Sequence, residues 1–296
     1  MTEHHNRRGV IAMTVGMVCF VLNDTLVKFV SDTLPTSQLI FLRGLMAVLG
    51  LFVLAYATDR SHFSQAGLSH LGNKWVVLRS ALDGAASLVY LSALSHMPIG
   101  NVTAINMSTP LLIALLSGLL LGVHVSGRNW LIIGLGFIGV LLVVQPQADG
   151  FNAWAWVALA GTLLHALRDL SVRFIAPHIP SMVITIGTAL AATVMAGIWS
   201  IATPWQAVSV LHWLMMAAAA ALLSSGYFFL IKATRIADMS VVAPFRYMGL
   251  LTAVLAGYVI WGDIPNAMAW CGMLLLVGAG MLMLRLNRQA SNMGEH

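Results

Sequence analysis

The chain has 296 residues, of which 59 % are hydrophobic and only 8 % are charged, and its mean hydropathy is +0.88. Ordinary globular chains carry about 25 % charged residues, which a water-facing surface needs, so these values exclude a soluble fold. The formal net charge of +5 comes from basic residues scattered along the chain. Nucleic-acid-binding proteins instead gather such residues in a basic patch, so we expect no nucleic-acid partner.

Ten apolar stretches of about 20 residues follow one another, each long enough to cross a hydrocarbon core of about 30 Å as a helix. In chain order they begin near Val10, Thr36, Lys74, Asn101, Arg128, Ala153, Ser181, Ala207, Met239 and Asn266. They lack the alternation of apolar and polar residues that marks the strands of a membrane barrel. The sequence predicts an all-α integral membrane protein with ten transmembrane helices and short tails at residues 1–9 and 287–296.

Basic residues fall in alternate loops, so one side of the predicted membrane collects them together with both termini. That side holds Arg7, Arg8, Arg60, Lys74, Arg128, Lys232, Arg235, Arg285 and Arg288. The other side holds Asp32, Asp149 and Asp263 and no Lys or Arg. The positive-inside rule therefore predicts that both termini are cytoplasmic and that the protein lies in the cell membrane, which is the inner membrane in a bacterium.

The two halves of the sequence resemble each other. At a shift of 145 residues, the stretch VLNDTLVKF from Val21 aligns with ALRDLSVRF from Ala166. At a shift of 140, Gly122 and Trp130 align with Gly262 and Trp270. The predicted halves are residues 10–145 and 153–286, with five helices each. Because five is an odd number, the second half enters the membrane upside down, which predicts two inverted repeats of the kind that transporters use for alternating access.

These residues resemble the drug/metabolite transporter superfamily and, within it, the ten-helix proteins with two EamA domains. The resemblance is carried by Asn23-Asp24 with Lys28, Phe41-Leu42-Arg43, Leu78-Arg79 and Ala243-Pro244-Phe245-Arg246-Tyr247. The last stretch is similar to one in members that import S-adenosylmethionine or riboflavin. One departure is Gly122-Val123-His124, where members often have an acidic residue after the glycine, whereas Gly262-Asp263 keeps it. The resemblance implies a central cavity lined by the first, third, fourth, sixth, eighth and ninth helices.

Charged side chains inside the predicted spans are the main candidates for function. They are Lys28, Arg43, Arg79, Arg168, Arg173, Arg246, Asp24, Asp83 and Asp169. A charge at the membrane centre costs at least about 2.5 kcal/mol on insertion scales, so each needs a partner or water. The i,i+4 spacing predicts three pairs on common helix faces, namely Asp24 with Lys28, Arg79 with Asp83, and Asp169 with Arg173. Two interpretations are open for each pair: local charge neutralisation, or gating and coupling.

Three arginines lack such a partner. Arg43 is expected to be structural, with its guanidinium reaching toward the membrane surface. Arg168 adjoins Asp169, and the sequence leaves open whether it joins that acid or binds substrate. Arg246 lies about two turns into the ninth helix beside Pro244, which frees a backbone carbonyl within the span. This combination favours a binding role for Arg246.

The sequence thus predicts two sets of site residues. The substrate-binding candidates are Arg246, Tyr247, Arg79, Arg168, Asn106 and Asn23. The gating or coupling candidates are Asp24, Lys28, Asp169, Arg173, Asp83 and His165. Tyr90, Tyr227 and Tyr247 could each stack on or hydrogen-bond a ligand, but interface anchoring is the default for tyrosines near helix ends. Tyr247, deep in the ninth helix beside Arg246, is the best ligand-binding candidate of the three. Cys19 and Cys271 lie alone in apolar stretches, so we expect packing roles and neither a metal nor a cofactor.

Six basic groups against three acidic groups in the spans disfavour a purely cationic cargo. We therefore expect a secondary active or facilitative transporter of a small anionic or zwitterionic metabolite, such as an amino-acid, nucleoside or flavin-like compound. The alternative is a membrane enzyme or a non-transporting scaffold, but the sequence shows no catalytic cluster. It also contains no Gly-x-x-x-x-Gly-Lys loop for ATP. The expected partners are the substrate and membrane lipid, and both a monomer and a homodimer are open.

Overall fold

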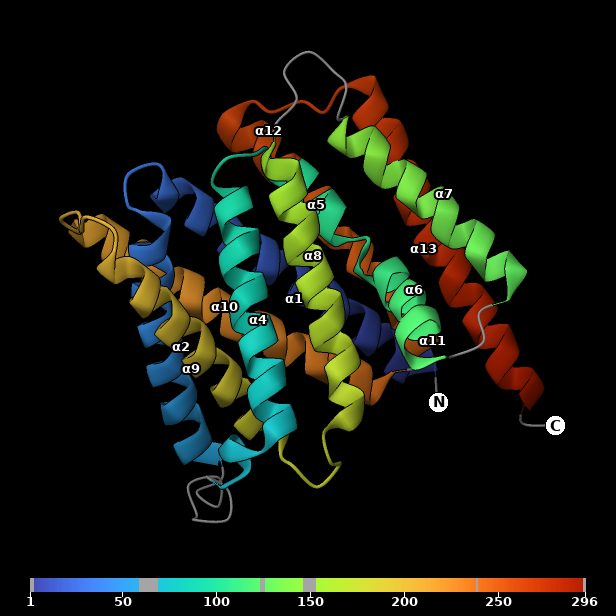
Figure 1. The fold of residues 1–296 in the computed structure, drawn as a ribbon, viewed down its shortest axis with the longest axis horizontal. Coiled ribbons are helices and arrows are strands. Elements are labelled where there is room, and N and C mark those ends of the chain that lie inside the picture. Colours follow the sequence, from blue (N-terminus) through green and yellow to red (C-terminus); the bar gives the residue numbers. More distant parts are fainter. Residues whose placement is uncertain (1–2, 59–68, 123–125, 146–152, 238, 295–296) are drawn as a thin grey trace.

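The structure is a computed structural model that describes residues 3–58, 69–122, 126–145, 153–237 and 239–294 (Figure 1). The described part is helical throughout and contains no strand. Arg60, His124 and Asp149, which the topology and motif arguments used, lie outside the described residues. The prediction of an all-α protein is confirmed for the rest.

The helices form ten successive segments within the described chain, two of which consist of two shorter helices. In order they are α1 (Glu3–Ser31), α2 (Thr36–Thr58), α4 (Lys74–Leu94), α5 (Ile99–Asn106) with α6 (Thr109–Leu121), α7 (Gly127–Val144), α8 (Trp154–Ser171), α9 (Ser181–Ile201), α10 (Val210–Ile236), α11 (Met239–Val242) with α12 (Met248–Trp261), and α13 (Ala267–Gly294). Short 3₁₀ turns are η2 (His70–Gly72), η3 (Val172–Phe174) and η4 (Ala243–Tyr247). This order confirms the predicted count of ten.

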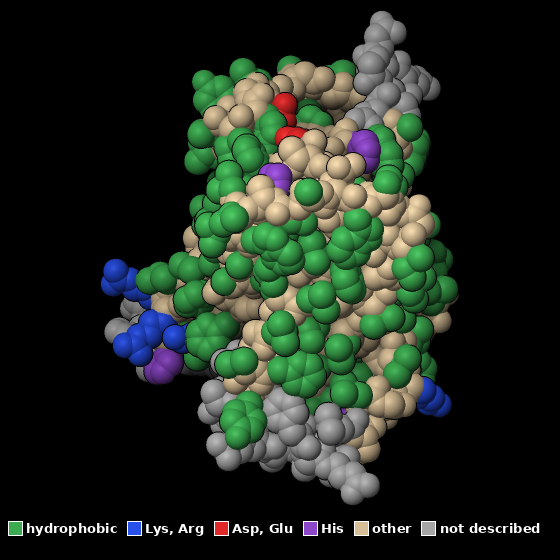
Figure 2. Space-filling view, turned by 90° about the vertical axis from the view of Figure 1, so that its left-hand side faces the viewer, with side chains coloured by type: hydrophobic (Ala, Val, Ile, Leu, Met, Phe, Trp, Pro, Cys, Tyr) green, Lys and Arg blue, Asp and Glu red, His purple; other side chains and the backbone are tan. Residues whose placement is uncertain are grey.

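Eight of these segments have the length and hydropathy of a membrane span among the described residues. The other two are α13, whose apolar part is the shorter segment Ala267–Met283, and α8, which carries Arg168 and Asp169 near its end. Large apolar side chains also cover the outside, including Leu131 with 72 % of its surface exposed. Figure 2 shows hydrophobic side chains across the middle of one face. A surface of this kind fits a lipid environment.

The fourth segment is interrupted between α5 and α6. Pro110 sits in the first turn of α6, where its missing N–H is not needed. The hydroxyls of Ser108 and Thr109 donate to the carbonyls of Ile105 and Asn106, both at 2.6 Å. Because these local hydrogen bonds satisfy the carbonyls that the helix leaves free, the helix can be interrupted inside the bundle.

The ninth segment is interrupted in the same way, by η4 around Pro244. Both interrupted segments then end on a glycine with a left-handed backbone, Gly122 with φ 62° after α6 and Gly262 with φ 70° after α12. Glycine adopts this conformation without the steric penalty that a Cβ would bring. The fourth segment of each half therefore has both an interruption at a proline and a C-terminal glycine cap.

The helices pack in pairs, with α1 on α10, α4 on α8, α2 on α9 and α7 on α13. Figure 1 shows α7 and α13 together along one edge of the bundle and α2 with α9 on the opposite side. Gly139 and Gly272 allow the backbones of α7 and α13 to approach, since a Cβ on either would come within 2.9 or 2.6 Å of the other's carbonyl oxygen. These pairs enclose the polar residues described next.

Candidate functional site

Polar side chains from α1, α2 and α4 meet inside the bundle. Arg43 Nη1 donates to Asn23 Oδ1 at 2.8 Å, and Asn23 Nδ2 donates to Asp24 Oδ1 at 2.9 Å. The hydroxyl of Tyr90 donates to Asp24 Oδ2 at 3.1 Å, and Arg43 also interacts electrostatically with this carboxylate. Asp24 is therefore compensated by residues of three helices.

This network continues to α8 and α5. The rings of Tyr90 and His165 lie 5.8 Å apart between centroids. His165 Nδ1 and Asn106 Oδ1 are 3.0 Å apart, and Nδ1 donates because an amide oxygen can only accept. Asn106 is the last residue of α5, so the break in the fourth segment positions its side chain. The interruption between α5 and α6 thus supplies one partner of His165.

A second network centres on Arg168 of α8, which bridges two carboxylates. Arg168 Nη1 donates to Asp83 of α4, and its Nε and Nη2 lie 2.9 and 2.8 Å from Asp169 Oδ1. Arg168 thus forms ion pairs with both Asp83 and Asp169. The Asp83 side chain is 5 % exposed and that of Asp169 is 30 % exposed. Of the two carboxylates, Asp169 is therefore the accessible one.

We call the residues of these two networks the central cluster. It consists of Asn23, Asp24, Arg43, Asp83, Tyr90, Asn106, His165, Arg168 and Asp169. The structure thus brings together three of the substrate-binding candidates and four of the gating or coupling candidates. Among the described residues, no group of three His, Cys, Asp or Glu side chains could hold a metal ion.

Two members of the central cluster depart from their predicted roles. Arg43 is 8 % exposed and donates to Asn23, so the expectation that its guanidinium reaches the membrane surface is wrong. Tyr90 is buried and bonded to Asp24, so the expectation of an interface anchor is wrong as well. In both cases the side chain forms its hydrogen bond with a polar residue inside the bundle and not with the lipid headgroups.

Tyr227 of α10 belongs to this site, although the sequence analysis favoured interface anchoring over ligand binding for it. It interacts electrostatically with Arg43, Asp83 and Arg168, and therefore lies where the two networks approach each other. Its ring packs edge-on against Phe20, with the centroids 5.1 Å apart. The available signal was its position well inside α10, away from either end, where interface anchoring is not the default.

The three predicted i,i+4 pairs are wrong in the described structure. Arg79 Nη1 donates to Thr188 Oγ1 of α9 at 2.8 Å, while Asp83 pairs with Arg168. Arg173 is exposed and lies in η3, beyond the end of α8, where the spacing of an α-helix no longer applies. Arg79 and Asp83 therefore find their partners on neighbouring helices and not on their own helix.

Lys28 was predicted to pair with Asp24, but in the structure it connects three helices. Its Nζ donates to the carbonyl oxygen of Leu94 at 3.1 Å and to that of Met97. The same ammonium lies 5.4 Å from the ring centroid of Trp261 at the end of α12. Carbonyls at the C-terminal end of a helix carry partial negative charge and attract a cation. Lys28 of α1 thus ties the end of α4 to the end of α12.

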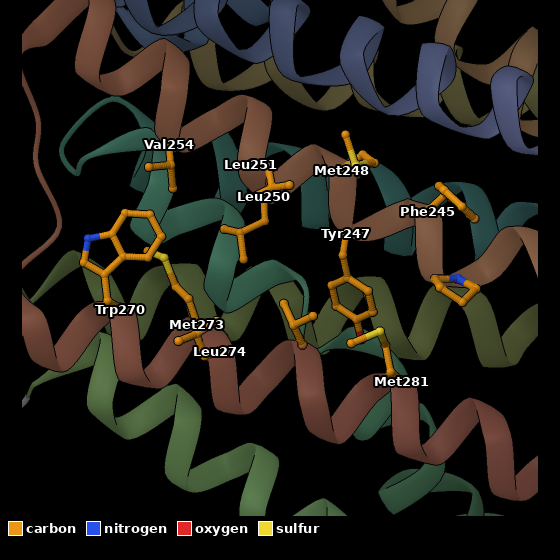
Figure 3. Close-up of a pocket in the computed structure, with 12 residues that line it drawn as sticks. Phe245, Tyr247, Met248, Leu250, Leu251, Val254, Trp270, Met273, Leu274 and Met281 are labelled. Carbon is orange, nitrogen blue, oxygen red and sulfur yellow. The ribbon is translucent and has the colours of Figure 1, made fainter.

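Arg246 and Tyr247 lie together in η4. Arg246 is half-buried and, within the described chain, makes no hydrogen bond or ion pair. Tyr247 is buried and points across to α13, as Figure 3 shows. No hydrogen bond or ion pair among the described residues joins either side chain to the central cluster. The two strongest candidates of the ninth segment therefore stand apart from it in this structure.

The contact between Tyr247 and α13 leads to a stability prediction. A Cβ on Gly280 would lie 1.5 Å from the Tyr247 hydroxyl oxygen, whereas a Cβ on Gly278 would meet nothing within 4 Å. We expect Gly280→Ala to displace Tyr247 and to destabilise the protein by about 1–3 kcal/mol, as overpacking does. Gly278→Ala, the matched control, should leave stability unchanged or slightly raised. Thermal melting in detergent measures both, and equal melting temperatures would contradict the packing described here.

Comparisons with known proteins point to one family. A family model described as the EamA-like transporter family matches residues 7–145 and again residues 152–285. The pseudopaline exporter CntI of Pseudomonas aeruginosa is 24 % identical over 291 residues, which cover 95 % of this chain and 98 % of that protein. The riboflavin transporter of Vibrio cholerae is 25 % identical over 279 residues, covering 93 % and 92 %. The S-adenosylmethionine uptake transporter of Rickettsia bellii is 21 % identical over 285 residues, covering 95 % of each.

A solved crystal structure has a similar fold. The TM-score is 0.63 at 19 % identity, and 94 % of this chain and 98 % of that chain are covered. The family match confirms the resemblance that the sequence motifs indicated and identifies an integral membrane protein. Because the family model matches the sequence twice and covers most of it, the chain belongs to the EamA-like transporter family.

Proposed function

We propose that this protein is a secondary active or facilitative transporter that moves a small zwitterionic or anionic metabolite across the cell membrane by alternating access. The observation that carries the proposal is the central cluster, which places charges of both signs between the helices of a membrane protein. Intramembrane charges are costly and commonly mark substrate or ion pathways. Named relatives move riboflavin, S-adenosylmethionine or pseudopaline, so the family accommodates varied organic cargo.

Arg43 supports an anionic group on the substrate. Its Nε is buried and has no hydrogen-bond partner among the described residues, although its Nη1 binds Asn23. An unsatisfied buried donor costs about 1–3 kcal/mol, or more when it is charged. A carboxylate or another electron-rich group of the substrate would satisfy this donor. Arg43 thus joins the substrate-binding candidates Asn23, Asn106, Arg168, Arg79, Arg246 and Tyr247.

Asp169 supports a cationic group at the other end of the substrate. Arg168 is shared between Asp83 and Asp169, so the three groups together carry one excess negative charge. Asp169 is the more exposed of the two acids, and an ammonium group would balance the excess. Because the Nε of Arg43 also lacks a partner among the described residues and can take an anionic group, a zwitterion matches the central cluster better than a simple cation does.

The helix packing supports two inverted repeats. If each segment of the first half corresponds to the fifth segment after it, the packing of α1 on α10 corresponds to that of α8 on α4. Likewise, the packing of α4 on α9 corresponds to that of α10 on α2, and α7 on α13 corresponds to itself. In this arrangement both termini are cytoplasmic. Figure 2 agrees with that orientation, because acidic side chains lie toward one end and Lys and Arg side chains nearer the other.

The proposal is tested by ligand-dependent stability followed by transport. A substrate that binds the folded protein raises the melting temperature of the purified protein by mass action. We expect zwitterionic or anionic metabolites to do so and their amine-only analogues not to, and the stabilising compounds to undergo counterflow in proteoliposomes. Stabilisation by simple cations alone, or the absence of counterflow for every stabilising compound, would contradict the proposed cargo class.

Arg246 provides a residue-level prediction. Its half-buried guanidinium beside the break at Pro244 has no partner in the described chain, so it is available to a substrate anion. We expect Arg246→Ala to abolish counterflow while the melting temperature without substrate stays close to that of the unmodified protein. Arg128→Ala, at an exposed position at the start of α7, is the control and should transport normally. Normal counterflow in Arg246→Ala would assign Arg246 a structural role.

A further inference from the structure

A groove runs between η4 and α12 on one side and α13 on the other, and it has a volume of about 270 Å³. Its walls include Tyr247, Leu251 and Val254 on the first side and Trp270, Val277 and Met281 on the second. Figure 3 shows these two rows of side chains facing each other across the groove. None of its 12 lining residues is charged. The groove is thus an apolar slot beside η4, and the central cluster contributes no residue to it.

The groove opens toward the membrane. Leu251 and Leu274 line it and still have 58 % and 69 % of their surface exposed on the outside of the bundle. From Trp270 to Met281 the groove follows α13 for 11 residues, or about 16 Å at 1.5 Å per residue. This length is close to half of a hydrocarbon core of about 30 Å, which is the depth of one leaflet. An extended acyl chain has both the shape and the chemistry to fill it.

A basic side chain lies where the groove reaches the membrane surface. Arg285 is four residues after Met281, so it lies on the same face of α13, and it is exposed. The apolar part of α13 ends at Met283, which places Arg285 at the level of the lipid headgroups. A guanidinium binds phosphate oxygens with two parallel hydrogen bonds. Along α13 a basic side chain at the headgroup level is therefore followed by an apolar groove within the membrane, which matches the phosphate and the acyl chain of a phospholipid.

We propose that this groove is a binding site for an anionic phospholipid, with one acyl chain between α12 and α13 and the phosphate on Arg285. The acyl chain contacts Phe245 and Tyr247, the two neighbours of Arg246 in η4. The bound lipid therefore packs against η4, the segment that carries Arg246. This inference goes beyond the transported substrate, since it concerns a lipid that stays with the protein.

Native mass spectrometry of the delipidated protein, titrated with phosphatidylglycerol or phosphatidylcholine, tests the proposal. We expect a retained lipid adduct and a preference for phosphatidylglycerol. Val277→Trp fills the groove and should reduce binding of both lipids at least tenfold. Arg285→Gln should remove the preference while phosphatidylcholine binding remains. Leu282→Trp and Arg128→Gln are matched controls outside the groove and should bind as the unmodified protein does.

Three outcomes would overturn the proposal. They are equal lipid binding by Val277→Trp and Leu282→Trp, an unmodified protein that retains neither lipid, and an anionic preference that survives in Arg285→Gln. Melting curves and gel filtration of each variant verify folding before the titration. If Val277→Trp does not fold, Leu274→Trp narrows the same groove from an exposed position, and the same expectation applies to it.

Discussion

Replacing Arg168 by glutamine should destabilise the protein more than any other single substitution in the central cluster. Arg168 ties α8 to α4 through Asp83 and also compensates Asp169. Its loss leaves two carboxylates between the helices without a cation, and removing one partner of a buried ion pair costs about 3–5 kcal/mol. We expect the melting temperature in detergent to fall by roughly 10 °C.

Two further variants separate this effect from a general sensitivity to mutation. Arg79→Gln removes the hydrogen bond to Thr188 but leaves both ion pairs of Arg168 in place, and should cost about 1 kcal/mol. Asp83→Asn combined with Arg168→Gln removes the more buried carboxylate together with the arginine, and should recover part of the stability. Measuring the three melting temperatures side by side checks the assignment. If Arg168→Gln melts like the unmodified protein, the ion pairs do not hold α4 and α8 together.

Replacing Lys28 by methionine should shift the balance between the two access states. Lys28 donates to two carbonyls at the end of α4 and faces Trp261, so it holds one end of α1, α4 and α12 together. In the proposed topology this is the outer end. A hydrogen bond to a charged group contributes about 1.5–3 kcal/mol, and 1.4 kcal/mol changes an equilibrium constant tenfold. We expect the outward-open population to rise at least tenfold relative to the inward-open one.

Distances between spin labels at Ile201 and Ile264 measure this shift. Both positions are exposed, with 84 % and 72 % of their surface accessible. Ile201 is the last residue of α9 and Ile264 follows the end of α12, both on the proposed outer side. The distance distribution should gain a longer component in Lys28→Met. Arg173→Gln is the matched control, because Arg173 aligns with Lys28 at the shift of 145 but is exposed in this structure. A longer component in both variants, or in neither, would show that Lys28 does not close the outer end.

Membrane insertion and the ten helices follow from the sequence alone, because the transfer of about 20 apolar residues into lipid depends on local composition. The break before α6 was also predictable, since Pro110 lacks an N–H wherever it stands. Both properties belong to short windows of the chain. They do not require knowledge of which helices lie side by side.

The partners of the intramembrane charges, in contrast, can be identified only when it is known which helices lie side by side. Arg168 is 85 residues from Asp83 in the chain, and the packing of α8 on α4 brings them together. Lys28 reaches the carbonyl of Leu94 across 66 residues, although Asp24 lies one turn away on its own helix. In a low-dielectric interior a charge is stabilised by contacts within a few ångströms, and only the three-dimensional arrangement of the helices determines which groups come that close.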